Sequence, residues 1–175
     1  EESFDISSDL GAMARHPVAV VSAGAKAFLD LAKTLEVLET LGVPVVGYQT
    51  NEFPAFWSRS SGLPIAHRAE SPAELAAMMR AARAIGWGGG MLIANPIPEA
   101  SEIPADEIAV AIEKGLAAAV AAGARGPAAT PRILAAIADA TASRSIPANL
   151  ALAESNASLA AAVAVAAAQE DVTGR

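Results

Sequence analysis

The first third of the chain alternates apolar and polar positions in a way that is typical of a strand, a helix and a second strand. Residues 18–23 (VAVVSA) are nearly all apolar and are followed by Gly24, as in a parallel strand that is buried on both faces. Apolar side chains then recur every three or four positions over residues 25–41, which predicts an amphipathic helix ended by Gly42. Residues 43–48 (VPVVGY) repeat the strand pattern. Together these segments predict a right-handed parallel crossover.

The remaining segments continue this alternation. Residues 49–69 have no steady period and hold several aromatic residues, so we expect a structured loop with functional contacts there. The segment SPAE at 71–74 is a capping box with proline at the first helical position, and it predicts a helix that reaches about residue 85. A strand is expected at 91–94 (MLIA), and helices at 104–122, 131–142 and 150–168. This order predicts an α/β fold, a layered α/β/α domain with a mainly parallel sheet whose loops meet at one functional edge.

Composition narrows the possible partners. Hydrophobic residues make up 53% of the chain but aromatic residues only 4%, so the core must be built from Val, Ile and Leu. The longest near-continuous apolar stretch, residues 159–168, is shorter than the roughly 20 residues of a membrane span, and we therefore expect no membrane partner. The formal net charge of −7, without any run of Lys or Arg, argues against nucleic acid as a partner.

A metal ion bound by this chain would need mainly oxygen ligands, because cysteine is absent and histidine is scarce. The chain has no cysteine and two histidines, which excludes disulfides, thiol catalysis, a cysteine zinc site and a His-rich metal centre. The segment DISSDL places Asp5 and Asp9 four positions apart, with Ser7 and Ser8 between them. One carboxylate could bind a hard divalent cation while the other transfers protons. The alternative is a helix start capped by Ser7 or Ser8.

Lys26 is the candidate nucleophile. It follows the first predicted strand and lies at the predicted opening turn of the helix 25–41, where the positive end of the helix macrodipole disfavours a cation. A neutral amine at such a position can form a Schiff base with a sugar aldehyde. The alternative is an ordinary solvated lysine at a helix end.

Other polar candidates carry weaker signals. The run RSSG at 59–62 could bind an anion or form a structural turn, and Asn149 could be a helix N-cap or a substrate-binding amide. His16 and His67 stand alone and are interpreted as ordinary polar residues. The segment SAGAK has neither the dinucleotide-binding nor the phosphate-loop spacing, so no nucleotide cofactor is expected.

Several segments together resemble the pseudouridine-5′-phosphate glycosidase family, also called indigoidine synthase A-like. They are DISSDL at 5–10, the long block at 17–62 from PVAVVSAGAK to SRSSG, NPIP at 95–98, TPRIL at 130–134 and ANLALAESNASLAAAVA at 148–164. The resemblance implies reversible cleavage of the carbon–carbon glycosidic bond of pseudouridine 5′-phosphate to uracil and ribose 5-phosphate. It also implies a cytoplasmic, manganese-containing homotrimer with an α/β/α fold.

The resemblance also implies roles for individual residues. Lys26 matches the lysine that forms an imine with C1′ of the ring-opened sugar, and Asp9 matches the aspartate of proton transfer. Ser7, Ser8 and Asp9 match a substrate-binding tripeptide. Asp5 matches the metal-binding aspartate, whose other ligands are mainly waters, and Mn²⁺ is expected there with Mg²⁺ as the alternative. Asn149 matches an asparagine that contacts the uracil ring.

Members of the resembling family are considerably longer than this chain, and the resemblance places residues 1–175 in the C-terminal part of a single domain. The upstream half of the family supplies a glutamate proton donor and several sugar-phosphate contacts, so we expect no turnover by the 175-residue chain alone. Two other functions stay open at this point. One is a class I aldolase-like Schiff-base enzyme for another sugar phosphate, and the other is a non-catalytic scaffold fragment of an oligomer.

Overall fold

The centre of the molecule is a four-stranded parallel sheet in the order β1-β4-β2-β3. The structure is a computed structural model that describes residues 6–26, 28–123 and 129–173. The strands are β1 (Ala19–Ser22), β2 (Val45–Tyr48), β3 (His67–Ala69) and β4 (Met91–Ala94). In the sheet, Ala94 of β4 pairs with Ser22 on one side and with Gly47 on the other. The expected crossover therefore joins two parallel strands of one sheet, with β4 inserted between them.

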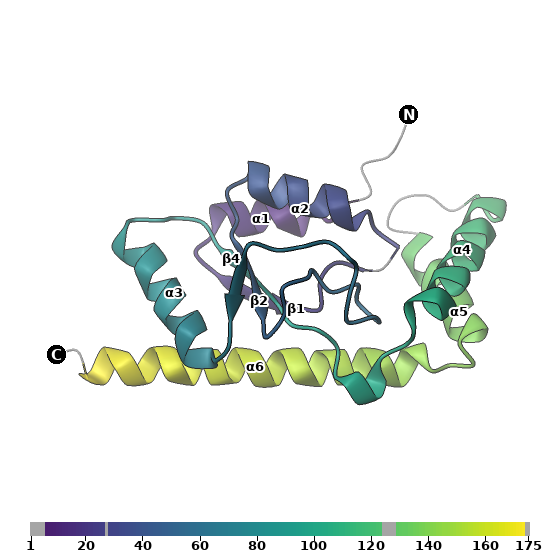
Figure 1. The fold of residues 1–175 in the computed structure, drawn as a ribbon. Coiled ribbons are helices and arrows are strands. Elements are labelled where there is room, and N and C mark those ends of the chain that lie inside the picture. The colour runs from purple at the N-terminus through teal and green to yellow at the C-terminus, as the bar shows by residue number, and fades with distance from the viewer. Residues whose placement is uncertain (1–5, 27, 124–128, 174–175) are drawn as a thin grey trace.

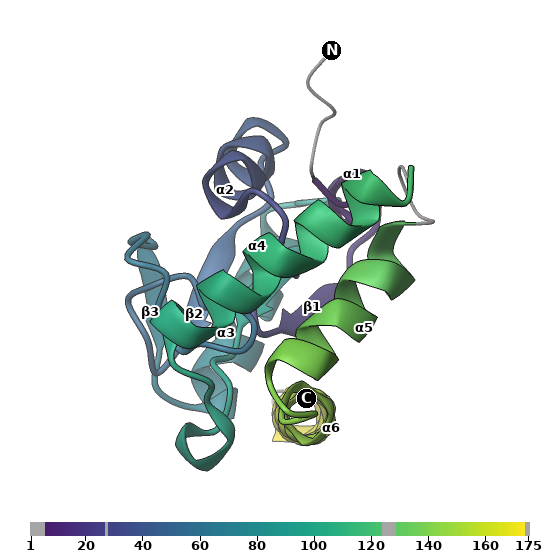
Figure 2. The same ribbon diagram turned by 90° about the vertical axis from the view of Figure 1, so that its right-hand side faces the viewer.

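Helices cover both faces of this sheet (Figure 1). α1 (Asp9–Arg15) and α2 (Leu31–Thr40) lie on one face, and α3 (Pro72–Ala84) and α6 (Ser145–Thr173) lie on the other. The short 3-10 helix η1 (Glu99–Ser101) precedes α4 (Ala105–Ala121), which packs against α5 (Ala129–Ala140) beside the first part of α6 (Figure 2). The layered α/β/α fold expected from the sequence is confirmed.

The central strand β4 is buried on both faces, which explains why apolar and polar residues do not alternate along it. All four of its residues are buried, and successive side chains of a strand point to opposite faces of the sheet. Leu92 packs in one cluster with Leu38 of α2, whereas Ile93 packs in another cluster with Leu75 of α3 and Leu159 of α6. Because helices cover both faces, no position of this strand is available for a polar side chain.

Helix α2 begins later than the pattern predicts, at Leu31 rather than at residue 25. The Asp30 side chain caps the helix by accepting a hydrogen bond of 2.9 Å from the Lys33 backbone N–H, and it pairs with Lys33 Nζ at 3.2 Å. The backbone N–H of Lys33, followed by its side chain, holds the pKa of Asp30 below its ordinary value. The apolar period continues before Asp30 because Phe28 packs against the core without being helical.

Two other boundaries also differ from the prediction. The segment 49–69, expected as a loop, ends in β3, a short edge strand whose His67 and Arg68 are exposed and which therefore carries no hydrophobic pattern. Arg68 bonds to Glu70, which raises the pKa of Arg68 and lowers that of Glu70. The helix expected at 150–168 runs from Ser145 to Thr173. Pro147 is tolerated in its first turn because the N–H groups there have no helical acceptor.

Helix α6 is more extensive than the apolar stretch 159–168 suggests. Among the described residues, Ser145–Gln169 is the one helix that is long and apolar enough to cross a membrane, by length and composition alone. Leu159 and Val163 of α6 are buried in the cluster that includes β4 and α3, but only 17% of the apolar window is buried inside the molecule. The absence of a membrane partner stays a prediction.

Candidate active site

Three loops meet at the carboxyl edge of the sheet, because the carboxyl ends of parallel strands point the same way. One loop follows β1 and carries Lys26, and a second follows β4 from Asn95 onward. The third follows β2 and carries the aromatic segment 53–57. Hydrogen bonds tie them together: the Asn95 N–H donates to the Ser22 carbonyl at 2.8 Å, and the Phe56 N–H donates to the Ala23 carbonyl at 3.0 Å.

Gly24 allows the first and third of these loops to touch. Its φ is +86°, a conformation that glycine adopts without strain. A Cβ added at Gly24 would lie only 2.0 Å from the carbonyl oxygen of Pro54 and 3.4 Å from a ring carbon of Phe53. The close approach of the loop that carries Lys26 to the aromatic segment therefore requires glycine at this position.

Lys26 is exposed, in the loop between β1 and α2. The Leu29 N–H donates to its carbonyl oxygen at 2.8 Å, and α2 begins only at Leu31, after its cap at Asp30. The interpretation that Lys26 opens a helix and faces its dipole is therefore wrong, because the macrodipole acts within the first turn and that turn begins beyond Asp30. The position after β1 at the carboxyl edge is confirmed.

The serine and aspartate candidates lie at the start of α1. Its last turn lies at the amino ends of the strands, because the Gly90 N–H, just before β4, donates to the Met13 carbonyl at 2.7 Å. Asp9 is the first residue of α1 and lies at the other end of the helix from that turn.

The expected helix start at Ser7 and Ser8 is confirmed. Ser8 holds the N-cap position of α1 without a side-chain bond. The Ser7 hydroxyl instead accepts a hydrogen bond from the Asp9 N–H at 3.2 Å and donates to Asp9 Oδ2 at 3.0 Å. The Asp9 carboxylate is exposed and oriented by Ser7, and among residues 6–26, 28–123 and 129–173 no other group is bonded to its second oxygen.

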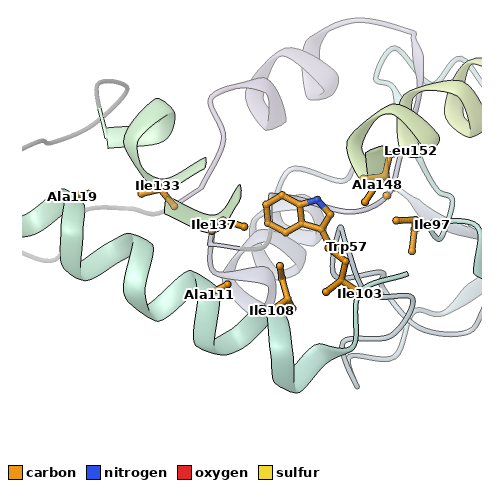
Figure 3. Packing of buried hydrophobic residues seen from close by; sticks show 11 residues of the cluster. Trp57, Ile97, Ile103, Ile108, Ala111, Ala119, Ile133, Ile137, Ala148 and Leu152 are labelled. Carbon is orange, nitrogen blue, oxygen red and sulfur yellow. The ribbon is translucent and has the colours of Figure 1, made fainter. Parts of the chain in front are cut away.

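Asn149 lies inside α6, so its interpretation as a helix N-cap is wrong: that helix begins four positions earlier, at Ser145. Its Oδ1 accepts a hydrogen bond of 2.8 Å from Nε1 of Trp57. Trp57 is 1% exposed, and Figure 3 shows its ring within a cluster of side chains from α4, α5 and α6, with the indole nitrogen at the ring edge facing Ala148. The two partners are 92 positions apart, and no sequence signal links them.

The run RSSG forms a structural turn, and its expected alternative as an anion site is not supported. A guanidinium N–H of Arg59 donates to the Ile97 carbonyl, and its backbone N–H donates to the Glu102 carboxylate at 2.8 Å. The Ser60 hydroxyl donates to Glu52, and the Ser61 hydroxyl donates to the Phe53 carbonyl. These groups fasten the aromatic segment to the chain that follows β4.

Two of the hollows formed by the described residues bear on the location of the candidate site. A groove of about 570 Å³ lies at the amino ends of β2 and β3, lined in part by Pro44, His67 and Trp87, away from the candidate site. A smaller one of about 220 Å³ lies beside the partners of Trp57, and its walls include Glu102, Ile103, Arg144 and Ala148. Lys26 lines neither of them.

No metal centre is formed by the described residues alone. Residues 6–26, 28–123 and 129–173 contain no group of three or more His, Cys, Asp or Glu side chains that could hold an ion. Asp5, the expected metal ligand, lies outside the described residues. The described side chains therefore do not make up a ligand set for a metal ion.

Comparisons with known proteins agree with the resemblance carried by the sequence motifs. The family model described as "Indigoidine synthase A like protein" matches residues 1–166. A pseudouridine-5′-phosphate glycosidase of Methylobacterium nodulans is 58% identical over 166 residues, covering 95% of this chain and 49% of the relative. One of Paracoccus denitrificans is 52% identical over 166 residues, covering 95% and 55%. The chain thus spans about half the length of these curated relatives.

Solved structures share the fold. The prealnumycin C-glycosynthase in complex with ribulose 5-phosphate is 31% identical, with a TM-score of 0.82 over 96% of this chain and 55% of that one. An indigoidine synthase A-like protein from Thermotoga maritima is 38% identical, with a TM-score of 0.81 over 91% and 52%. From the family match over residues 1–166 together with these relatives, the chain belongs to the indigoidine synthase A-like family.

Proposed function

We propose that this chain carries the sugar- and uracil-binding edge of a pseudouridine-5′-phosphate glycosidase. The observation that carries the proposal is the 58% identity to a relative of that name across 95% of the chain. The proposed reaction is the reversible cleavage of pseudouridine 5′-phosphate to uracil and ribose 5-phosphate. The link from the loop of Lys26 through Phe56 and Trp57 to Asn149 supports it, because a sugar and its base need binding groups on several segments.

A lysine suits the chemistry of a C-glycoside. An ordinary glycosidase protonates a leaving oxygen or nitrogen, but the base of pseudouridine leaves from carbon and offers no such atom. In the proposed reaction the Lys26 amine attacks C1′ and displaces the ring oxygen, which takes up a proton. The uracil carbon takes up a proton, and the bond from C1′ to that carbon then breaks, its electron pair restoring the ring double bond, while the nitrogen lone pair forms the imine with C1′. Water hydrolyses the imine and releases ribose 5-phosphate.

The side chains of α1 would serve the proton transfers and substrate binding. Asp9 is the proposed group that moves protons between the sugar and the uracil carbon. Its hydrogen bond from Ser7 suits a carboxylate that must be oriented to accept a proton at one atom and return it at another. Ser7 and Ser8 would bind the substrate beside it.

Metal, assembly and location complete the proposal. Asp5 is the proposed carboxylate ligand of Mn²⁺, with Mg²⁺ as the alternative, and water would supply most other ligands, as hard divalent cations allow. The full protein is proposed to be a cytoplasmic homotrimer. These features follow from the family resemblance.

A second candidate function is a class I aldolase-like Schiff-base reaction on another sugar phosphate. The observation that favours it is the keto sugar phosphate, ribulose 5-phosphate, in the structure of the prealnumycin C-glycosynthase. Both candidates use Lys26. Uracil release from pseudouridine 5′-phosphate favours the first, whereas cleavage of a keto sugar phosphate without uracil release favours the second.

Borohydride trapping tests the role of Lys26. The full-length gene product is incubated with ribose 5-phosphate and sodium borohydride, and the labelled peptide is mapped by mass spectrometry. We expect label on Lys26, and none in this peptide after Lys26→Ala. Lys114→Ala, at an exposed lysine of α4, is the matched control and should leave trapping unchanged. Label absent from Lys26 in an active enzyme would remove the mechanism.

A further inference from the structure

We propose that Trp57 is a positioning residue that orients the amide of Asn149, so that Asn149 offers its NH₂ group to a carbonyl oxygen of the pyrimidine base. The inference deepens the proposed function, on which the identity of the base rests.

The direction of the amide follows from the chemistry of the indole. The indole nitrogen of tryptophan carries one hydrogen and can only donate. The atom of Asn149 that lies 2.8 Å from Nε1 of Trp57 must therefore be the carbonyl oxygen Oδ1. The usual ambiguity between the oxygen and nitrogen of an amide does not arise here. With Oδ1 held against the indole, Nδ2 is the end of the amide turned away from Trp57.

Trp57 is held firmly enough to impose this orientation. Its ring is 1% exposed and packs edge-on against Phe56, with centroids 4.9 Å apart and an interplanar angle of 86°. Its carbonyl accepts a hydrogen bond from the Ile103 N–H at 2.9 Å, and the next residue, Ser58, donates to the Ile103 carbonyl at 2.8 Å. The close packing around the buried ring restrains the indole, and the two hydrogen bonds fix the backbone that carries it.

The NH₂ group of Asn149 remains available to a ligand. Within the part of the chain that the structure describes, no acceptor is bonded to Nδ2, whereas Oδ1 is bonded to Trp57. The side chain is half-buried, so the group is partly shielded from water without being enclosed. A donor of this kind gains from binding an acceptor that water competes for only weakly.

Continuous contacts place this donor at the carboxyl edge that carries Lys26. The Phe56 N–H bonds to the carbonyl of Ala23, three positions before Lys26. Trp57 follows Phe56 directly and bonds to Asn149. The loop with the proposed nucleophile and the helix with the amide are therefore joined through two consecutive aromatic residues.

The fixed orientation of the Asn149 amide also predicts specificity for uracil over cytosine. The carbonyl oxygens of a uracil ring accept hydrogen bonds, whereas the exocyclic amine of a cytosine ring donates them. An amide fixed with its NH₂ group toward the ligand donates a hydrogen bond to a uracil carbonyl oxygen. Against the exocyclic amine of cytosine, the same NH₂ group would place two donors face to face. Asn149 held by Trp57 would thus select the keto form of the base at the contacted position.

The first test changes the donor and keeps the acceptor. Asn149→Asp retains an oxygen for the Trp57 indole but replaces the NH₂ group with a second oxygen. Uracil binding to the full-length gene product is measured by calorimetry, and we expect the variant to lose about tenfold or more in affinity. The indole N–H resonance of Trp57, assigned by its disappearance in Trp57→Phe, should keep the shift of a hydrogen-bonded group. Unchanged affinity for uracil would overturn the inference.

The second test asks whether Trp57 acts through Asn149. Trp57→Phe removes the indole N–H, and we expect a several-fold rise in the Kd of uracil and in the KM of pseudouridine 5′-phosphate, with a smaller change in kcat. In the Asn149→Asp background the same change should add no further loss of uracil affinity. If the fold-loss of uracil affinity in the double variant equals the product of the losses in the two single variants, Trp57 acts only through general packing, and the inference is overturned. Trp87→Phe, at the other tryptophan of the chain, which is 38% exposed, is the matched control.

Two readouts separate this inference from the proposed function. If the wild-type protein binds uracil and Asn149→Asp weakens that binding, but pseudouridine 5′-phosphate is not cleaved, the proposed reaction fails and the inference about the amide stands. If the wild-type protein cleaves pseudouridine 5′-phosphate but Asn149→Asp and Trp57→Phe leave uracil affinity and KM unchanged, the inference fails and the reaction stands. A wild-type protein without affinity for uracil would overturn the inference.

Discussion

Replacing Gly24 with alanine tests whether the contact between the Lys26 loop and the aromatic segment holds the candidate site together. The added Cβ would lie 2.0 Å from the Pro54 carbonyl oxygen and 3.1 Å from its carbonyl carbon. Non-bonded carbon atoms prefer separations of about 3.5–4.0 Å. Because the obstructing atoms belong to the backbone, the two loops must move apart to accommodate a methyl group.

The expected cost of this substitution has two parts. A positive φ costs a residue with a Cβ about 1–2 kcal/mol relative to glycine. Moving the loops apart also weakens the hydrogen bond from Phe56 to Ala23, which contributes about 1 kcal/mol, and loosens the packing of Phe53. We therefore expect Gly24→Ala to lower the free energy of unfolding by about 3 kcal/mol.

Gly62 provides a matched control for the backbone strain. Its φ is +74°, close to that of Gly24, but a Cβ there would meet nothing within 4 Å. Gly62→Ala should therefore cost only the strain of about 1–2 kcal/mol. Urea denaturation of the full-length gene product measures both values from the transition midpoints. Trapping at Lys26 should fall in Gly24→Ala and not in Gly62→Ala. Equal destabilisation by the two substitutions would refute the reasoning, because the clash would then have no energetic consequence.

The remaining predictions concern two carboxylates. Because the pKa of Asp30 is lowered in the folded protein, its contribution to stability should be complete above the ordinary aspartate pKa of about 3.9 and should be lost as the pH falls through the lowered folded value. Urea midpoints measured against pH should show that Asp30→Ala is less stable than wild type near neutral pH and that this difference in stability disappears in acid. Asp30→Asn should lie closer to wild type, because asparagine also caps helices. A difference in stability that does not depend on pH would contradict this prediction. Asp5→Asn should lower the affinity for Mn²⁺ measured by calorimetry, and an unchanged affinity would show that the metal ligand is misassigned.

Local sequence patterns determined most of the elements. The run MLIA at 91–94 coincides with β4, because a strand covered on both faces must be apolar throughout. The capping box at Ser71 predicts the start of α3, and in the structure the Ser71 side chain accepts a hydrogen bond from the Glu74 N–H at 3.2 Å. Both features depend on residues within a few positions of one another. Residue type and position marked Lys26, Asp5, Asp9 and Asn149 as candidates, each with an alternative left open, and the family resemblance supplied their specific roles.

Tertiary contacts decided what these patterns could not. α2 begins at Leu31 and not at the predicted residue 25. Phe28 fits the apolar period of the helix, but it packs against the core as part of the loop in which Gly24 contacts Pro54. β3 forms because its backbone pairs with β2, and its exposed side chains give no signal of that pairing. The bond from Trp57 to Asn149 joins residues 92 positions apart. Burial periodicity is a short-range property of a chain, whereas the choice of a hydrogen-bond partner depends on which loops the finished sheet brings to the same edge.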